Sequence, residues 1–251
     1  MNYKIAILIT TFLRDTLLYR TLQTIADNYT EDCIVLVADQ GYSSTEKHIN
    51  IDYFKSKISL EYFRLPFDSG LSVARNLLVQ KAKERDIPYC LLSADSIQFL
   101  VPLNFSPIIQ FLELDVKRGL VGFDLEKSKC SWEYLMEVTP KGIKFSNSNI
   151  ETCFGNIKLL KVDICRNIFL AKTESLINLW DEELKLGEHE IAFLEYKKRG
   201  YEVYWTNSYT FKRVSPNNSN EYKQYRNRLR DYLMFVKEKL NINGWVIYPK
   251  K

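Results

Sequence analysis

The sequence predicts an α/β fold, in which a mostly parallel sheet lies between helices in a single domain. Three observations support this fold class. Short apolar stretches alternate with helical stretches over the first hundred residues, several apolar stretches end beside a carboxylate, and 251 residues suit one large α/β domain. A chain of this length can bury a substantial core.

Four apolar stretches in the first half have the length and composition of buried strands. They cover residues 4–10, 33–39, 60–65 and 89–92. Residues after the first strand, up to about Asn28, have a helical pattern, and so do residues 72–85. Strands and helices that alternate at this pace are typical of parallel sheets.

The second half is less regular. We expect strands over 120–125, 162–172 and 201–205, and paired strands or long loops over 130–156. We expect helices over 173–180, from 186 to Arg199, and over about 221–240. Gly200 would cap the second of these helices.

Composition excludes several classes of protein. The net charge of +4 is too small to indicate nucleic-acid binding, and it suits an anionic small ligand or an anionic membrane surface. The five cysteines form no CxxC pair, which favours a reduced, cytoplasmic setting and no zinc site. We find no apolar run long enough for a transmembrane helix and no signal peptide, so we expect a soluble or at most peripheral protein.

Ligands of open parallel sheets bind outside the carboxyl ends of the strands. This rule selects four segments, which are Thr10 to Arg14, Asp39 to Gly41, Asp68 to Gly70, and Asp95 with Ser96. A carboxylate at such a position can accept hydrogen bonds from ribose hydroxyls or from a base N–H. For Asp39 alone, a role as a helix cap or turn residue is an equal alternative.

Several common site motifs are absent from the sequence. It contains no GxGxxG, no GxxxxGK[ST] and no GxSxG, which argues against dinucleotide dehydrogenases, P-loop enzymes and α/β-hydrolases. The two histidines, His48 and His189, are too few for a histidine-built metal site.

Three segments together resemble the donor-binding half of GT-A glycosyltransferases. They are Thr10-Thr11-Phe12-Leu13-Arg14, the run Ile34 to Asp39, and Leu65-Pro66-Phe67-Asp68-Ser69-Gly70-Leu71-Ser72-Val73-Ala74-Arg75-Asn76. The chain is similar to family 2 enzymes and, within the fold, to β-1,4-N-acetylgalactosaminyltransferases of the ganglioside-synthase type. The resemblance continues over 89–99 and from Val162 to about Arg213. It implies a GT-A domain over 1–215, with a nucleotide-sugar-binding half over 1–100 and an acceptor-binding half over 101–215, and a packed C-terminal helix and tail over 216–251.

The resemblance implies a set of residues that bind the nucleotide sugar. The set is Thr10, Thr11, Phe12, Arg14, Asp39, Gly70, Arg75, Asn76, Asp95 and Arg213. Arg14 and Arg75 would reach the nucleotide region, and the helix that begins near Gly70 would present its N-terminus to phosphate. The alternative for Arg75 is an ion pair with an acidic surface neighbour.

Glycosyltransferases of this fold usually bind Mg²⁺ or Mn²⁺ through a D-x-D motif after the fourth strand. The matching segment here is Ala94-Asp95-Ser96, and Lys212-Arg213 stands where relatives often have a metal-binding histidine. We therefore expect the metal to be weakly bound or absent, with Lys212 or Arg213 neutralising the diphosphate. The rival interpretation is that Asp95 alone holds the metal through waters.

Inverting transfer needs a base for the acceptor hydroxyl. Relatives supply it from an acidic cluster at a helix start, which Gly187-Glu188-His189-Glu190 matches. Two residues on a regular helix are about 200° apart, so we assign Glu190 as the base and Glu188 to acceptor binding or the first turn. The alternative is that both carboxylates only suit the helix dipole. We expect His189 to be a cleft or packing residue.

Aromatic residues have two interpretations. Core packing is the commoner explanation for Trp132, Tyr134, Trp180 and Trp205, and stacking on sugars is the alternative. The basic and aromatic stretch 222–235 fits a helix packed on the domain with a solvated basic face, or a helix lying on an anionic membrane surface.

The resemblance implies an inverting transferase that moves GalNAc or galactose from a UDP-sugar to a hydroxyl of a glycan or lipid-linked glycan. Synthesis of capsule or lipopolysaccharide is the expected setting, in the cytoplasm or at the inner membrane face. The alternative is a non-catalytic nucleotide-sugar-binding subunit or scaffold. A nucleotidyltransferase is less favoured, because residues 10–14 contain no glycine.

Overall fold

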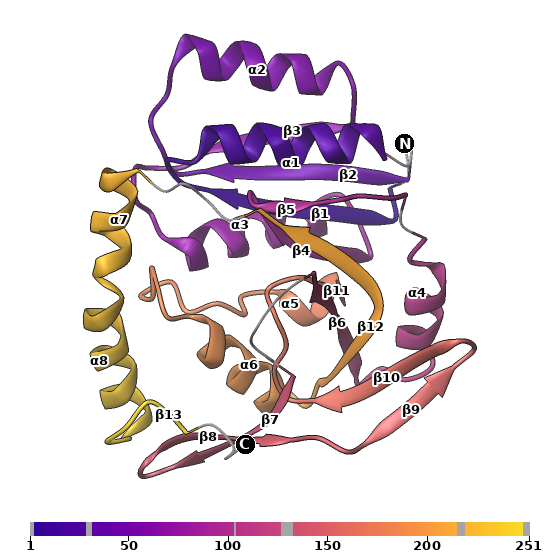
Figure 1. The fold of residues 1–251 in the computed structure, drawn as a ribbon, viewed down its shortest axis with the longest axis vertical. Coiled ribbons are helices and arrows are strands. Elements are labelled where there is room, and N and C mark those ends of the chain that lie inside the picture. The colour runs from indigo at the N-terminus through magenta and orange to yellow at the C-terminus, as the bar shows by residue number, and fades with distance from the viewer. Residues whose placement is uncertain (1–2, 29–31, 103, 127–132, 215–218, 248–251) are drawn as a thin grey trace.

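The structure is a computed structural model that describes residues 3–28, 32–102, 104–126, 133–214 and 219–247. Within these residues the chain forms one large mixed sheet with helices on both faces and one small second sheet (Figure 1). Trp132 and the expected domain boundary at 215–216 lie outside the described residues.

Ten strands make the large sheet. They are β1 (Ile5–Thr11), β2 (Cys33–Asp39), β3 (Leu60–Arg64), β4 (Tyr89–Ala94), β5 (Ile97–Gln98), β6 (Arg118–Leu125), β9 (Glu151–Phe154), β10 (Ile157–Val162), β11 (Phe169–Lys172) and β12 (Glu202–Arg213). The second sheet contains β7 (Tyr134–Thr139), β8 (Gly142–Asn147) and β13 (Val246–Ile247).

The described helices connect and cover these strands. They are α1 (Asp15–Asp27), α2 (Thr45–Lys55), α3 (Leu71–Lys83), α4 (Ser106–Glu113), α5 (Thr173–Leu176), α6 (His189–Lys198), α7 (Asn220–Asn227) and α8 (Leu229–Leu240).

The large sheet has the order β3-β2-β1-β4-β11-β6-β12-β10-β9, with β5 paired to β12. Strands β3, β2, β1 and β4 are parallel, whereas β11 is antiparallel to both of its neighbours. Strand β12 is parallel to β6 and antiparallel to β10. The parallel half therefore has its carboxyl ends on one edge, where β1 and β4 finish side by side at Thr10 and Ala94.

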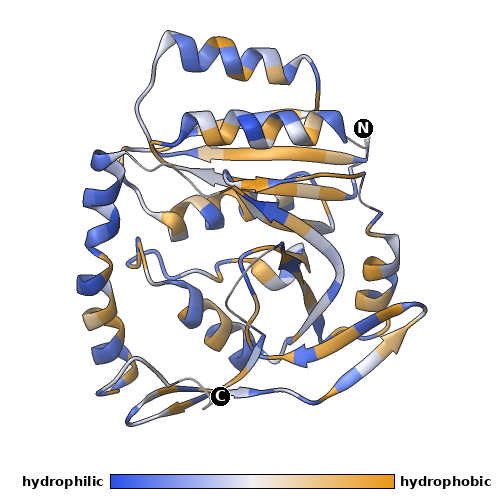
Figure 2. Ribbon diagram, viewed as in Figure 1, coloured by the Kyte–Doolittle hydropathy of each residue, from blue (hydrophilic) through white to orange (hydrophobic). Residues whose placement is uncertain are grey.

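Alternate side chains of the central strands enter two different cores. On β1, Ile5, Ile7 and Ile9 pack with α1, α2 and α4, whereas Ala6 and Leu8 pack with α3 and α6. This alternation follows from the two-residue repeat of a strand, and burial on both faces explains why the strand is apolar throughout. Figure 2 shows the apolar residues concentrated on these central strands, while α7 is largely hydrophilic.

The four strands expected in the first half are confirmed, and so are the helices that become α1 and α3. Helices α2 and α4 were not predicted. The strand expected over 162–172 is confirmed only at its end, as β11 from Phe169 to Lys172, because Val162 belongs to β10 at a different place in the sheet. The expected last helix is divided into α7 and α8 at Arg228, whose side chain forms an ion pair with Asp68.

Helices α7 and α8 run along one side of the molecule, from the strand ends of the parallel half toward β13 (Figure 1). Tyr222 and Val236 are buried, so both helices pack on the domain. Among the described residues, no helix has the length and apolar character needed to cross a bilayer.

Candidate active site

A cleft of about 770 Å³ lies at the carboxyl ends of β1 and β4 and extends to the start of α6. The predicted site residues that line it are Thr10, Thr11, Phe12, Arg14, Gly70, Arg75, Glu188, Glu190 and Arg213. Asp39, Asn76 and Asp95 are not on its surface. Of these three, Asp95 bonds to Thr11 and Arg14, which do line the cleft.

Strand pairing brings distant segments to this cleft. Thr10 pairs with Ala94 across β1 and β4, and Arg213 at the end of β12 pairs with Ile97 on β5. The backbone N–H of Val214 also donates to the carbonyl of Ser96 at 2.9 Å. Arg213 is therefore held next to the Asp95 segment, whereas the adjacent Lys212 does not line the cleft.

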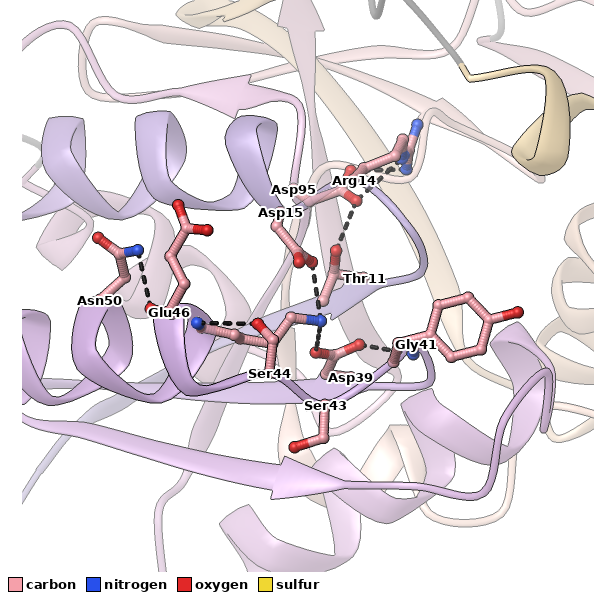
Figure 3. A network of polar contacts seen from close by, with 12 residues as sticks. Thr11, Arg14, Asp15, Asp39, Gly41, Ser43, Ser44, Glu46, Asn50 and Asp95 are labelled. Atoms are coloured by element: carbon pink, nitrogen blue, oxygen red, sulfur yellow. Dashed lines mark hydrogen bonds and ion pairs between the residues drawn. The ribbon is translucent and has the colours of Figure 1, made fainter.

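Asp95 is fully buried and is bound by two residues of the β1 end (Figure 3). Its Oδ1 lies 2.6 Å from Arg14 Nη2, and its Oδ2 accepts from Arg14 Nε and Thr11 Oγ1, each at 3.0 Å. Burial raises the pKa of Asp95 to about 6, although Arg14 and Thr11 favour the charged form. Asp95 thus holds Arg14 in place at the cleft wall.

This arrangement does not provide a site for Mg²⁺ or Mn²⁺. These ions need several oxygen ligands, and both carboxylate oxygens of Asp95 are bound to Arg14. In the described parts of the chain, no group of three histidine, cysteine, aspartate or glutamate side chains is arranged to hold a metal ion. The residues present therefore do not fit the metal that the fold usually binds.

One face of α3 holds the loop that leads to the acidic cluster. Ser72 Oγ donates to the carbonyl of Leu184 at 2.7 Å. The Asn76 amide donates to the carbonyl of Trp180 at 2.8 Å and accepts from its N–H at 3.2 Å. The position of Asn76 therefore makes it a support for this loop.

Gly70 precedes α3 with a φ of +103°, a conformation that favours glycine. A Cβ at this position would lie 2.8 Å from the Cγ of Lys185, so the close approach of the loop also requires glycine. The Gly70 and Leu71 N–H groups donate to Gln40 Oε1 and to the Lys185 carbonyl. These two amides of the α3 N-terminus are consequently not available to a phosphate.

Arg75 and Glu188 form a buried ion pair across the cleft wall, with 2.6 Å between Nη1 and Oε1. Burial alone would raise the pKa of Glu188, but the adjacent Arg75 guanidinium outweighs it and lowers the pKa. Arg75 thus has an acidic partner, but this partner is buried at the cleft and is not the surface neighbour of the alternative. Glu188 remains a carboxylate over the neutral pH range and holds Arg75 at the cleft.

Glu190 lies in the first turn of α6 and is the carboxylate suited to accept a proton. Burial and, to a smaller extent, the nearby charge of Glu188 raise its pKa to about 7. Both glutamates line the cleft because α6 begins at His189, which leaves Glu188 at the cap position outside the regular helix. A base whose pKa is near neutral is effective in proton transfer at physiological pH.

His189 also lines the cleft but is not suited to carry positive charge. Burial lowers its pKa to about 4, its Nδ1 lies 2.9 Å from Asn167 Oδ1, and its ring packs edge-on against Phe193. It is therefore a neutral packing residue at neutral pH, as the sequence predicts.

The C-terminal helices form a wall of the cleft that the sequence did not predict. Its lining residues from α7 and α8 are Tyr222, Tyr225, Arg226, Leu229 and Leu233, with Arg228 between the helices. Phe12 contacts the rings of Tyr222 and Tyr225, and Arg228 forms an ion pair with Asp68 at 2.6 Å. Only the mixture of basic and aromatic residues over 222–235 hinted at this role.

Cationic side chains outnumber carboxylates on the cleft surface. They are Arg14, Arg75, Arg166, Lys185, Arg213, Arg226 and Arg228, against Asp68, Glu188 and Glu190. Among the residues that the structure describes, Arg213 and Arg226 form no ion pair. The cleft is therefore suited to an anionic ligand.

Core packing accounts for the described aromatic residues that were considered for sugar stacking. Trp180 is buried, and Tyr134 and Trp205 pack against the same apolar cluster. Trp245, which the sequence did not single out, lines the cleft instead.

Comparison with known proteins agrees with this geometry. Residues 6–115 match the family model described as Glycosyl transferase family 2, which covers less than half of the chain. No curated protein sequence matches the chain.

Solved glycosyltransferase structures have a similar fold. The structure of S. aureus TarS 1–349 matches with a TM-score of 0.62 and 13% sequence identity. The match covers 93% of this chain and 65% of the TarS chain. A second match is the mannosyltransferase PcManGT from Pyrobaculum calidifontis in complex with GDP-Man and Mn²⁺, with a TM-score of 0.64 and 13% sequence identity. This match covers 97% of this chain and 66% of the PcManGT chain. TarS 1–349 in complex with UDP-GlcNAc matches with a TM-score of 0.62 and 10% sequence identity. The match covers 95% of this chain and 70% of the TarS chain.

The similar structures confirm the predicted α/β fold, of the GT-A type, and the family model indicates a glycosyltransferase domain over residues 6–115. The chain spans only 40% of a longer TarS structure, and 65% of the shorter one. The comparisons lend no support to the narrower resemblance to ganglioside-type N-acetylgalactosaminyltransferases.

Proposed function

We propose that the chain transfers a sugar with inversion from a UDP-linked donor to a hydroxyl of a glycan or lipid-linked glycan. The observation that carries this proposal is the position of Glu190 in the same cleft as Arg213, which has no ion-pair partner within the described ranges. A transferase needs both a base for the acceptor and positive charge for the leaving diphosphate.

In the proposed reaction the acceptor oxygen attacks the anomeric carbon and forms the new glycosidic bond. The bond from that carbon to the donor's phosphate oxygen breaks, and UDP leaves with the electron pair. The acceptor proton passes to the Glu190 carboxylate. Attack from the face opposite to the leaving group inverts the anomeric configuration.

Charge on the departing diphosphate must be neutralised, and the chain's own cations supply a means. Arg213 is exposed in the cleft and has no ion-pair partner among the described residues. Arg14, which Asp95 fixes before α1, and Arg75, which Glu188 fixes on α3, also present guanidinium groups to the cleft. A preorganised cation needs no reorganisation as the charge develops.

We expect transfer to survive excess EDTA and to be lost in the Arg213→Ala variant. Loss of one preorganised charge at the leaving group should lower kcat by about 10²–10³-fold. The measurement is UDP release in the presence of acceptor, with and without chelator.

Lys212→Ala is the matched control for this experiment, because Lys212 is the exposed neighbour of Arg213 on β12 but does not line the cleft. The Lys212 variant should retain transfer. Complete loss of wild-type activity in EDTA, restored by Mn²⁺, would contradict metal-independent neutralisation and favour the rival role of Asp95.

The identity of the sugar and acceptor is also part of the proposal. We propose GalNAc or galactose as the sugar, on the sequence resemblance alone, and the synthesis of a surface polysaccharide such as capsule or lipopolysaccharide as the setting. The enzyme would act in the cytoplasm, with lipid-linked acceptors reached at the inner membrane face. A donor panel that includes UDP-GlcNAc and GDP-mannose tests the sugar, since structural neighbours carry these two donors.

A non-catalytic nucleotide-sugar-binding subunit is the second candidate, and the loss of a D-x-D motif favours it. Hydrolysis of the donor without acceptor separates the two functions. A transferase slowly hydrolyses its donor with water as the acceptor, whereas a binding subunit does not. Slow release of UDP that disappears in Glu190→Gln supports the enzyme. Saturable binding without any hydrolysis or transfer would favour the subunit.

A further inference from the structure

Beside the start of α6, part of the cleft surface is apolar. This apolar wall consists of residues from the segment before α6, from α8 and from the chain after α8, which are Leu186, Leu229, Leu233 and Trp245. Leu186 is buried, whereas the other three are half-buried and still present apolar surface. Single exposed apolar residues are common on proteins, but a group that converges on one cleft indicates a binding surface.

The packing of α8 on Gly187 places the apolar wall next to the acidic cluster. Gly187 has a φ of +76°, and a Cβ at this position would lie 3.3 Å from Leu233 Cδ2 and 3.6 Å from Leu229 Cδ1. The methyl groups of α8 therefore lie against the residue that directly precedes Glu188. Because Glu188 and Glu190 line the same cleft, the apolar wall and the proposed base belong to one part of it.

Trp245 is held in the apolar wall by its backbone. Its carbonyl oxygen accepts from the Ile143 N–H at 2.8 Å, and the nearby Asn243 N–H donates to the carbonyl of Pro140 at 2.9 Å. A Cβ on Gly244 would overlap the carbonyl oxygen of Lys141, so this close approach requires glycine. The turn between β7 and β8 thus fixes the chain on both sides of the indole, and the wall is formed before any ligand binds.

We propose that the apolar wall binds an apolar aglycone of the acceptor and so presents the adjoining sugar hydroxyl to Glu190. This inference rests on the proposed function, in which Glu190 takes the proton of that hydroxyl. The occupant belongs to the acceptor because the wall adjoins the base, whereas the donor's nucleotide binds at the strand ends. Contact with such a wall is non-directional, so an alkyl, acyl or prenyl chain satisfies it equally.

Paired alkyl glycosides test this inference. Titration calorimetry in saturating UDP compares methyl with octyl β-glucoside, and methyl with octyl β-galactoside, below the concentrations at which the octyl compounds form micelles. The sugar is identical within each pair, so the ratio of dissociation constants reports the chain. We expect the octyl compound of at least one pair to bind about tenfold or more tightly, at one site per protein chain, because burial of two methylenes is enough for this gain.

Variants of α8 locate the bound chain. Leu233→Gln places a polar side chain of similar size in the apolar wall and should remove most of the gain from the octyl chain. Leu229→Gln makes the same change at the other leucine of α8 and is a second, independent variant. Met234→Gln is the matched control and should keep the gain, because Met234 is the exposed neighbour of Leu233 and does not line the cleft.

Octyl and methyl glycosides that bind alike with both sugars overturn the inference, while binding of UDP still supports the proposed function. A gain that survives both leucine variants, or that only Met234→Gln removes, places the chain outside the apolar wall and also overturns it. Wild-type protein that binds no UDP contradicts the proposed function and, with it, the assignment of the wall to an acceptor.

Discussion

The Glu190→Gln variant is expected to lose about 10²–10⁴-fold in kcat while it binds the donor as the wild type does. The amide cannot accept the acceptor proton, but it has nearly the same volume, and no ion pair of Glu190 is broken among the described residues. The measurement is steady-state transfer together with UDP affinity by calorimetry. Glu188→Gln is the comparison, because Glu188 is bound to Arg75 and is not free to act as the base.

The same residue sets the expected pH dependence. The pKa of Glu190 is raised to about 7, and only the deprotonated form accepts a proton. The wild-type kcat should therefore fall about tenfold per pH unit below 7 and level off above it. The residual rate of Glu190→Gln should lack this step. A wild-type profile that is flat from pH 5 to 8, or a variant with full turnover, would contradict the assignment of Glu190.

The second large effect concerns the stability of the cleft wall. Arg75→Met should lower the free energy of unfolding by about 3–5 kcal/mol, because it leaves the Glu188 carboxylate buried without its cation. The pKa of Glu188 should rise in this variant, since Arg75 is what lowers it in the wild type. Urea unfolding at neutral pH measures the loss.

Two further variants show whether the loss comes from the buried charge. Arg75→Met combined with Glu188→Gln removes both charges and should recover most of the stability. Lys81→Met breaks a solvent-exposed pair with Glu84 on the same helix and should change the unfolding midpoint little. An Arg75→Met variant as stable as the wild type would show that the pair contributes nothing to the wall.

The central strands can be predicted from the sequence. Because β1, β2 and β4 are buried on both faces, each has a continuous apolar run. Helix α2 lacks a clear apolar face, since its buried residues are Lys47, Ile51 and Phe54, and the lysine is buried only through its ion pairs. Helix α4 is only eight residues long, and Pro107 lies in its first turn. Both depend on tertiary contacts that local patterns do not encode.

The candidate site is readable from the sequence only in part. The strand-end rule selects Thr11 and Arg14, and the acidic cluster selects Glu190, all of which line the cleft. The rule also selects Asp39 and Asp95, but their charges are enclosed by neighbours that cannot be identified before folding. Strand ends indicate where a site lies, whereas hydrogen-bond partners decide which side chains remain available.

The C-terminal wall could not be predicted for a related reason. Tyr225 and Arg228 reach the cleft because α7 and α8 dock on Phe12, Phe67 and Asp68, about 160 residues or more away in sequence. The resemblance in the sequence ends at about Arg213, so it gave no guide to this part of the cleft. Residues from this wall complete an enclosure that the parallel half alone does not form.

Calorimetric titration of the wild-type chain with UDP and UDP-sugars in EDTA is the most direct test of the central claim, that this cleft holds a sugar nucleotide. The account predicts saturable binding of one nucleotide per chain, unchanged in Glu190→Gln and at least about tenfold weaker in Arg213→Ala. Absence of binding to every UDP-linked donor, or binding that Arg213→Ala leaves unaffected, would contradict it.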